Sequence, residues 1–193
     1  MSARNDQQIS AILDALYHGR TEVARDIAAQ ATELDVFEAA ALGDSARLRT
    51  LLTRDAALAN AYNVDGFTPL GLAAFFKHSD AVAVLLAAGA DPKVASDNAP
   101  RFTPLHSAVS TDAGAVDLEM VHALIDSGAD VNARNAQGTT ALHTAAFTGD
   151  VRVAWLLLDH GADPTIASVR GQTPLDIARE RGMTEVASAL ASR

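Results

Sequence analysis

The residues of this chain that could do chemistry are histidines with a hydroxyl or a carboxylate close by. Ser107 follows His106 directly, and a histidine base beside a serine can activate a nucleophile. Adjacent residues of a helix point in different directions, so this pair cannot act together. His122 and Asp126 could share a helix face, but two ligands make a poor site for zinc, which takes three or four. We therefore predict no catalytic, cofactor-binding or metal-binding residues.

A six-residue motif, here called the phrase, recurs four times in the chain, and two of the histidines belong to it. Its first residues lie 35, 37 and 33 positions apart, a period typical of a stacked solenoid. Threonine opens each copy and suits a helix N-cap, and proline follows it in three copies, where a helix tolerates proline. His106 and His143 share a position that Gly71 and Asp176 occupy in the other copies, so we expect a structural role, bonding to nearby backbone or to the threonine. The copies are residues 68–73, 103–108, 140–145 and 173–178.

A second recurring element, Gly-Ala-Asp, follows each of the first three copies, and two short helices fit between the two elements. We expect the first helix to end at a glycine in the left-handed conformation, except in the second unit, where Lys77 holds that place. From Gly-Ala-Asp to the next threonine the chain has no helical pattern. Gly66, Gly138 and Gly171 stand two residues before a threonine and suit a tight turn, which predicts a hairpin-like finger at each junction.

The recurring phrase, the Gly-Ala-Asp element and the period of the repeats together resemble the ankyrin repeat family over about residues 31–193. The run Phe-Glu-Ala-Ala-Ala-Leu-Gly-Asp at residues 37–44 is similar to small bacterial members. The resemblance implies an all-α solenoid of stacked helix-turn-helix units with short β-hairpin-like fingers. It also implies that the first helices line a concave groove, that the second helices form the convex back, and that the chain binds another protein without being an enzyme.

We expect a single domain over residues 1–193, because each unit of an array contacts only its neighbours. The finger at 91–103 is longer than its two successors, and residues 110–115 add about four residues between two helices. Such insertions either lie at a binding edge or are tolerated surface loops. The expected parts are an N-terminal helical cap 1–30, a degenerate repeat 31–59, a repeat 60–91, a repeat with insertions 92–130, a repeat 131–163 and a C-terminal capping repeat 164–193.

The composition limits the class of partner that we expect and the cellular compartment of the protein. A net charge of -9 argues against nucleic acid, whose binding depends on basic residues. The polar N-terminus has no apolar core like that of a secretion signal, and no apolar run suggests a membrane span, so we expect a cytoplasmic protein. We expect a monomer, with a dimer through the convex face at Trp155 as the alternative.

The residues that we expect to bind the partner lie just before and just after each copy of the phrase, and in the fingers. Six of the eight Phe and Tyr residues fall on this face, and the fingers hold four basic residues against two acidic ones. A partner with an apolar centre and an acidic rim would be complementary; the alternative is that some rings pack on a neighbouring finger or helix. The set is Tyr62, Phe67, Phe75, Phe76, Phe102 and Phe147 with Lys93, Arg101, Arg134 and Arg170.

The sequence therefore predicts a non-enzymatic protein that mediates a protein-protein interaction through its fingers and groove. A regulatory or immunity-type inhibitor that occludes a partner enzyme is the alternative. A small-molecule or metal-binding groove is a third reading, and no cofactor is expected.

Overall fold

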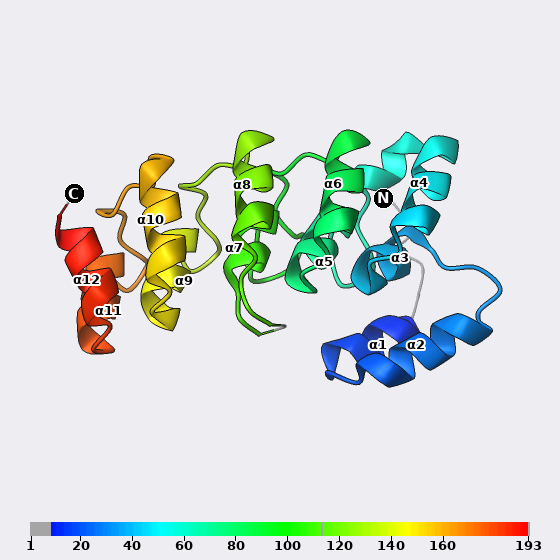
Figure 1. Ribbon diagram of the computed structural model, residues 1–193, viewed down its shortest axis with the longest axis horizontal. Coiled ribbons are helices and arrows are strands. Elements are labelled where there is room, and N and C mark those ends of the chain that lie inside the picture. Colours follow the sequence, from blue (N-terminus) through cyan, green and yellow to red (C-terminus); the bar gives the residue numbers. More distant parts are fainter. Residues whose placement is uncertain (1–8, 113, 193) are drawn as a thin grey trace.

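Pairs of antiparallel helices stand side by side in one row (Figure 1). The computed structural model describes residues 9–112 and 114–192, and these residues form helices and no strand. The predicted stack of helix-turn-helix units is confirmed. The first helices of the pairs are α3 (Val36–Leu42), α5 (Pro69–Phe75), α7 (Pro104–Val109), α9 (Ala141–Thr148) and α11 (Pro174–Glu180). The second helices are α4 (Ser45–Arg54), α6 (Ser79–Ala87), α8 (Leu118–Asp126), α10 (Val151–Asp159) and α12 (Thr184–Ala191), and a short 3-10 helix, η1 (Ala56–Asn60), follows α4.

The boundaries of the first helices follow from capping residues. Thr68 caps α5 by accepting a hydrogen bond from the Gly71 amide at 3.1 Å, and Thr103 and Thr173 cap α7 and α11 in the same way. Gly149 ends α9 with a φ of 77°, in the left-handed conformation that glycine adopts without strain. Lys77 stands at the equivalent place after α5 with a φ of 64°, as the sequence predicts.

Small and branched apolar side chains fill the space between the helices. Leucines such as Leu70, Leu105 and Leu142 of the first helices are at most 1% exposed. Alanines such as Ala73 and Ala108 are fully buried, and their small side chains let neighbouring helices approach closely. Burying one leucine stabilises the fold by roughly 1.5–3 kcal/mol, so the stack is held mainly by this continuous core.

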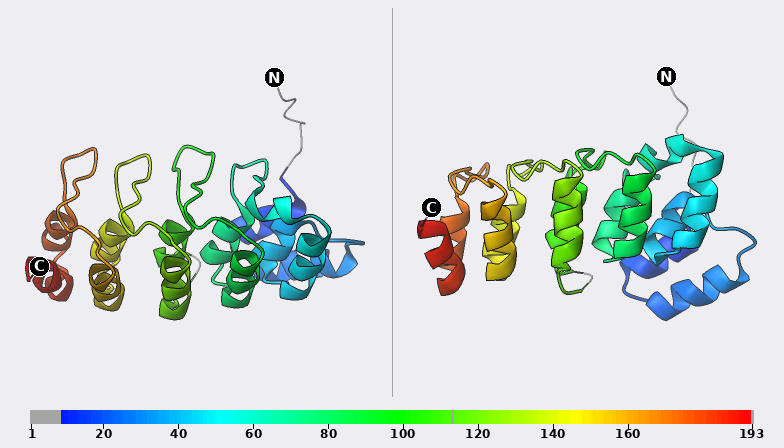
Figure 2. Two further views of the ribbon diagram at one scale, coloured as in Figure 1. Left: turned by 90° about the horizontal axis from the view of Figure 1, so that it is seen from above. Right: turned by 45° about the horizontal axis from the view of Figure 1, so that its top comes forward.

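The fingers project to one side of the helix stack, with the second helices on the far side (Figure 2, left). Each finger has one backbone hydrogen bond that closes its base and one within its turn, so it is a hairpin-shaped turn and not a pair of strands. Successive fingers are also bonded to each other at their tips. The closing bonds join Asn63 to Phe67, Ser96 to Phe102, Asn135 to Thr139 and Ser168 to Gln172, and the bonds between fingers join Asp97 to Gly66, Ala136 to Pro100 and Val169 to Gln137.

The first two helices, α1 (Ala11–Tyr17) and α2 (Thr21–Gln30), lie below the α3 and α5 end of the row in Figure 1 and are not parallel to the other helices. Ile12, Leu13 and Leu16 of α1 are buried. The ring of Tyr17 lies 6.3 Å from that of Phe67 and 6.1 Å from that of Phe76, so α1 reaches past α3 to α5. How the chain divides into units stays a prediction.

None of the helices in the described ranges is long and apolar enough to cross a membrane.

Candidate functional site

The two phrase histidines are buried links between units. Nδ1 of His143 accepts a hydrogen bond from the Thr140 amide at 3.1 Å, and its Nε2 lies 3.2 Å from the Gln172 carbonyl of the next finger. His106 repeats the arrangement with Thr103 and the Thr139 carbonyl. Because Nδ1 accepts, Nε2 carries the proton and donates to that carbonyl. The predicted structural role is confirmed.

The electrostatics of these histidines agree with that role. Burial lowers the pKa of both side chains, the backbone carbonyls raise it, and the nearby Arg134 charge lowers that of His143 further. Both rings are therefore neutral at pH 7, and both nitrogens of each ring are occupied. Neither ring is available as a base toward a bound substrate.

Three of the predicted aromatic residues are exposed. Phe147 is 53% exposed, Tyr62 45% and Phe102 38%. The Tyr62 hydroxyl donates to the Ala95 carbonyl at 3.0 Å, which ties its finger to the next one. The Phe102 ring stacks on that of His106, with centroids 5.8 Å apart. These rings are held in fixed positions while one side of each faces solvent.

The other three predicted aromatic residues, Phe67, Phe75 and Phe76, are half-buried. Phe75 meets Phe76 edge to face with centroids 5.1 Å apart. Tyr17 from α1 covers Phe67 and stacks on Phe76. The structure therefore divides the predicted aromatic face into an open part, Tyr62, Phe102 and Phe147, and a part around Phe67 and Phe76 that the chain itself covers.

All four basic finger residues are exposed, and Arg134 makes a hydrogen bond to the next finger. Arg134 donates from Nη2 to the Ala167 carbonyl at 2.9 Å and so links two fingers. Arg101 stands in the left-handed conformation at a φ of 53°, where other fingers have glycine. Lys93, Arg101 and Arg170 carry their charges on the exposed edge of the fingers. That this edge binds a partner stays a prediction.

Arg181 is a member of this surface that the predicted set omits. Its guanidinium lies 3.7 Å from the centroid of the Phe147 ring, and its Nε donates to the Phe147 carbonyl at 2.7 Å. A cation over a ring face is an attractive contact. The signal was available, because Arg181 ends its first helix as Phe147 and Thr148 end theirs. Tyr17 carried no such signal, since it lies outside the repeated phrase.

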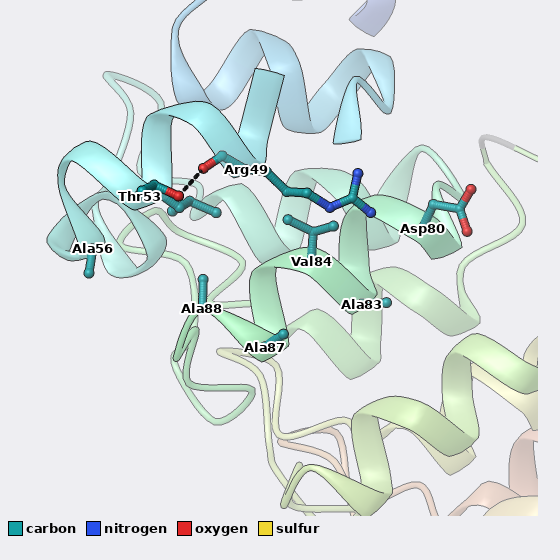
Figure 3. A pocket seen from close by; sticks show the side chains of 9 residues that line it. Arg49, Thr53, Ala56, Asp80, Ala83, Val84, Ala87 and Ala88 are labelled. Atoms are coloured by element: carbon teal, nitrogen blue, oxygen red, sulfur yellow. Dashed lines mark hydrogen bonds between the residues drawn. The ribbon is translucent and has the colours of Figure 1, made fainter. Parts of the chain in front are cut away.

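A hollow of about 620 Å³ lies on the far side from the fingers, between α4 and α6 (Figure 3). Arg49 and Asp80 flank it, and alanines make up much of its wall. The Thr53 hydroxyl donates its proton to the Arg49 carbonyl at 2.7 Å, so it could act toward a ligand only as an acceptor. A small-molecule site brings several polar groups together around an enclosed ligand, and this shallow hollow does not.

Metal-binding groups are not assembled in the described part of the chain, where no three His, Asp or Glu side chains cluster. The ring of His122 meets that of His160 edge to face, with centroids 5.2 Å apart.

Comparison with known proteins agrees with the geometry. A family model described as ankyrin repeats, in three copies, matches residues 36–135 and 105–193. The chain is also similar to neurogenic locus notch homolog protein 1 of Homo sapiens, Mus musculus and Cricetulus griseus, with 39% identity over 121 positions. The match covers 47% of this chain and 5% of each relative, so the chain spans only a small part of the length of these proteins.

Proposed function

Because the chain belongs to the ankyrin repeat family, we propose that it is a non-enzymatic module that binds another protein through its fingers and the groove formed by its first helices. The observation that carries the proposal is the open row of Phe102, Phe147 and the basic finger edge. Aromatic side chains bury much area at a small cost in entropy and dominate many interfaces. The proposed location is the cytoplasm and the proposed state is a monomer.

The mechanism that we propose is preorganisation. Each exposed ring is fixed by a second contact. A hydrogen bond holds Tyr62, a stacked ring holds Phe102, and a guanidinium holds Phe147. A side chain that is already ordered loses little entropy when a partner covers it, so more of the contact energy appears as affinity.

The charge of the surface suggests the partner. Lys93, Arg101 and Arg170 lie on the finger edge of a chain whose net charge is -9. A partner with an acidic rim around an apolar centre would be steered to this edge and repelled elsewhere.

Affinity capture from the source cell tests the proposal. The tagged wild-type chain should retain a partner that the double variant Phe102→Glu, Phe147→Glu loses, since two buried charges would oppose the contact. Trp155→Glu on α10 is the matched control, because it places the same charge on an exposed aromatic residue of the far side. Retention of every partner by the double variant would exclude this surface.

A further inference from the structure

α1 occupies the corner between the first finger and α5. Tyr17 stacks on Phe76 of the α5 end and contacts Phe67 of the finger base. Its hydroxyl lies near Asn63 and Asp65 of the same finger. A helix of this chain therefore sits where the fingers and first helices form the groove, while Phe102 and Phe147 further along stay exposed.

α1 is an amphipathic helix, and Tyr17 at its end is the residue that reaches this corner. Ile12, Leu13 and Leu16 are 3%, 3% and 6% exposed, and Tyr17 continues the same face. On the other side, Asp14 bonds to Arg20 in contact with solvent. A helix that lays aliphatic and aromatic side chains into a groove is a recurrent mode by which proteins recognise helical peptides.

The fit of α1 is incomplete at its polar end. The Tyr17 hydroxyl, Asn63 Nδ2 and Asp65 Oδ2 are buried, and none of the three makes a hydrogen bond of good geometry, although Asn63 and Asp65 lie close enough to the hydroxyl to shift the pKa of Tyr17. Burial and the Asp65 charge raise the pKa of Tyr17 to about 12. Buried polar atoms without partners weaken a contact, and a ligand with a better placed donor would satisfy the Asp65 oxygen.

The buried face of α1 is short, and α2 adds little to it. α1 has seven residues and α2 has one fully buried residue, Ala24. Helices of this length are not stable alone in water. The segment that joins them to α3 is anchored mainly by Arg47, which donates to the Leu34 carbonyl at 2.9 Å. Local opening of α1 and α2 would therefore leave the repeats intact.

We propose that α1 and α2 are an internal competitor for the groove, and that the partner enters with an amphipathic helix that takes the place of α1. That helix carries aliphatic residues and one aromatic or cationic residue on a single face. The aromatic or cationic residue is directed at Asp65. The inference rests on the proposed use of the groove, and it adds the shape and chemistry of the partner and a built-in restraint on its binding.

A fluorescent synthetic peptide of residues 10–31 of this chain is the probe, with anisotropy as the readout. The full chain is used in three forms: wild type, Tyr17→Ala, and Leu13→Asp with Leu16→Asp. Because the apparent affinity scales with the fraction of open groove, both variants should bind the peptide at least about tenfold more tightly than the wild type. Val23→Ala, a change at an exposed position of α2, should bind as the wild type does.

Hydrogen exchange of the same proteins makes each result decisive. The proposal expects α1 amides to lose protection in both variants while α5 and α7 keep theirs, and expects Phe76→Ala in the Tyr17→Ala background to abolish peptide binding. Equal peptide affinity for wild type and variants would overturn it, as would α1 amides that stay protected in both variants. Open variants that bind no peptide, or that dimerise and thereby exclude it, would also show that a foreign helix does not take this place.

These outcomes are independent of the capture experiment on Phe102 and Phe147. A partner lost with that double variant, together with failed peptide binding, would leave the proposed function standing and remove only the competitor.

Discussion

At the scale of single residues, Lys77 shows how a side chain can compensate a strained backbone. Its φ of 64° is unfavourable for any residue but glycine. Its Nζ donates to the carbonyls of Ser107 and Ala108, both at 2.9 Å, which satisfies the end of α7 in the next unit. Burial lowers its pKa to about 8. Lys77 thus has a strained backbone conformation, and its side chain makes a stabilising contact between two units.

Two substitutions separate these contributions. Lys77→Gly loses the two hydrogen bonds but relieves the strain, whereas Lys77→Ala loses the bonds and keeps the strain. The alanine variant should therefore be less stable than the glycine variant by about 1 kcal/mol. Urea unfolding measures the difference. Equal midpoints for the two variants would mean that the left-handed conformation costs nothing here.

The buried histidines predict a dependence of stability on pH. An unfolded histidine titrates near 6.5, and burial lowers the pKa of His106 and His143 in the fold. The unfolded state therefore binds more protons below pH 6.5, so the stability that is present above that pH is lost as the pH falls. We expect the melting temperature to drop between pH 7.5 and pH 5.5.

Matched variants assign this loss. His106→Gln with His143→Gln should be less stable at pH 7.5 but should lose less on acidification than the wild type. His18→Gln, which alters a side chain that is 65% exposed, is the control for a histidine substitution at the surface. The assignment fails if the double variant loses stability on acidification as steeply as the wild type does.

At the scale of elements, the fingers depend on glycines in two different ways. Gly66 and Gly171 have φ values of 80° and 75°, so alanine at either position strains the backbone by about 1 kcal/mol. A Cβ on Gly66 would also lie 2.8 Å from the backbone carbon of Asp97 in the next finger, whereas one on Gly171 would meet nothing within 4 Å.

Gly66→Ala should therefore cost about 1–3 kcal/mol more than Gly171→Ala, the usual penalty for overpacking. Thermal unfolding gives the comparison, and amide exchange should show the extra loss of protection around Asp97. Equal destabilisation by the two variants would contradict the close packing of successive fingers.

Sequence reasoning succeeded for elements whose cause is local. Thr68 and Pro69 start a helix, and Gly149 ends one, because each acts on backbone groups within a few residues. It could not find the contact of Tyr17 with Phe67 and Phe76, because the partners lie far apart in the chain and α1 has no repeated phrase to fix its position. The aromatic face was visible in the sequence, but its division into covered and open parts was not.

At the scale of the whole molecule, the helix pairs from α3 to α12 each contact only their neighbours, so the position of a destabilising substitution decides how far its effect spreads. Leu190 of α12 is 4% exposed and lies in the last helix, whereas Leu124 of α8 is fully buried between α6 and α10. Alanine at either position should cost about 2–5 kcal/mol locally.

The consequences should differ. Leu190→Ala should remove amide protection from α11 and α12 alone, and Leu124→Ala should lower it on both sides of α8. Hydrogen exchange read by mass spectrometry distinguishes the two patterns. A loss that spreads over the whole chain in Leu190→Ala would mean that the array unfolds as one cooperative unit.

The central claim is that the fingers and the first helices form the binding surface. Hydrogen exchange of the captured complex, compared with the free chain, tests it most directly. We predict added protection in the fingers around Arg101 and Arg170 and near Phe147, with α8 and α10 unchanged. Added protection in α8 and α10, with the fingers unchanged, would contradict the claim.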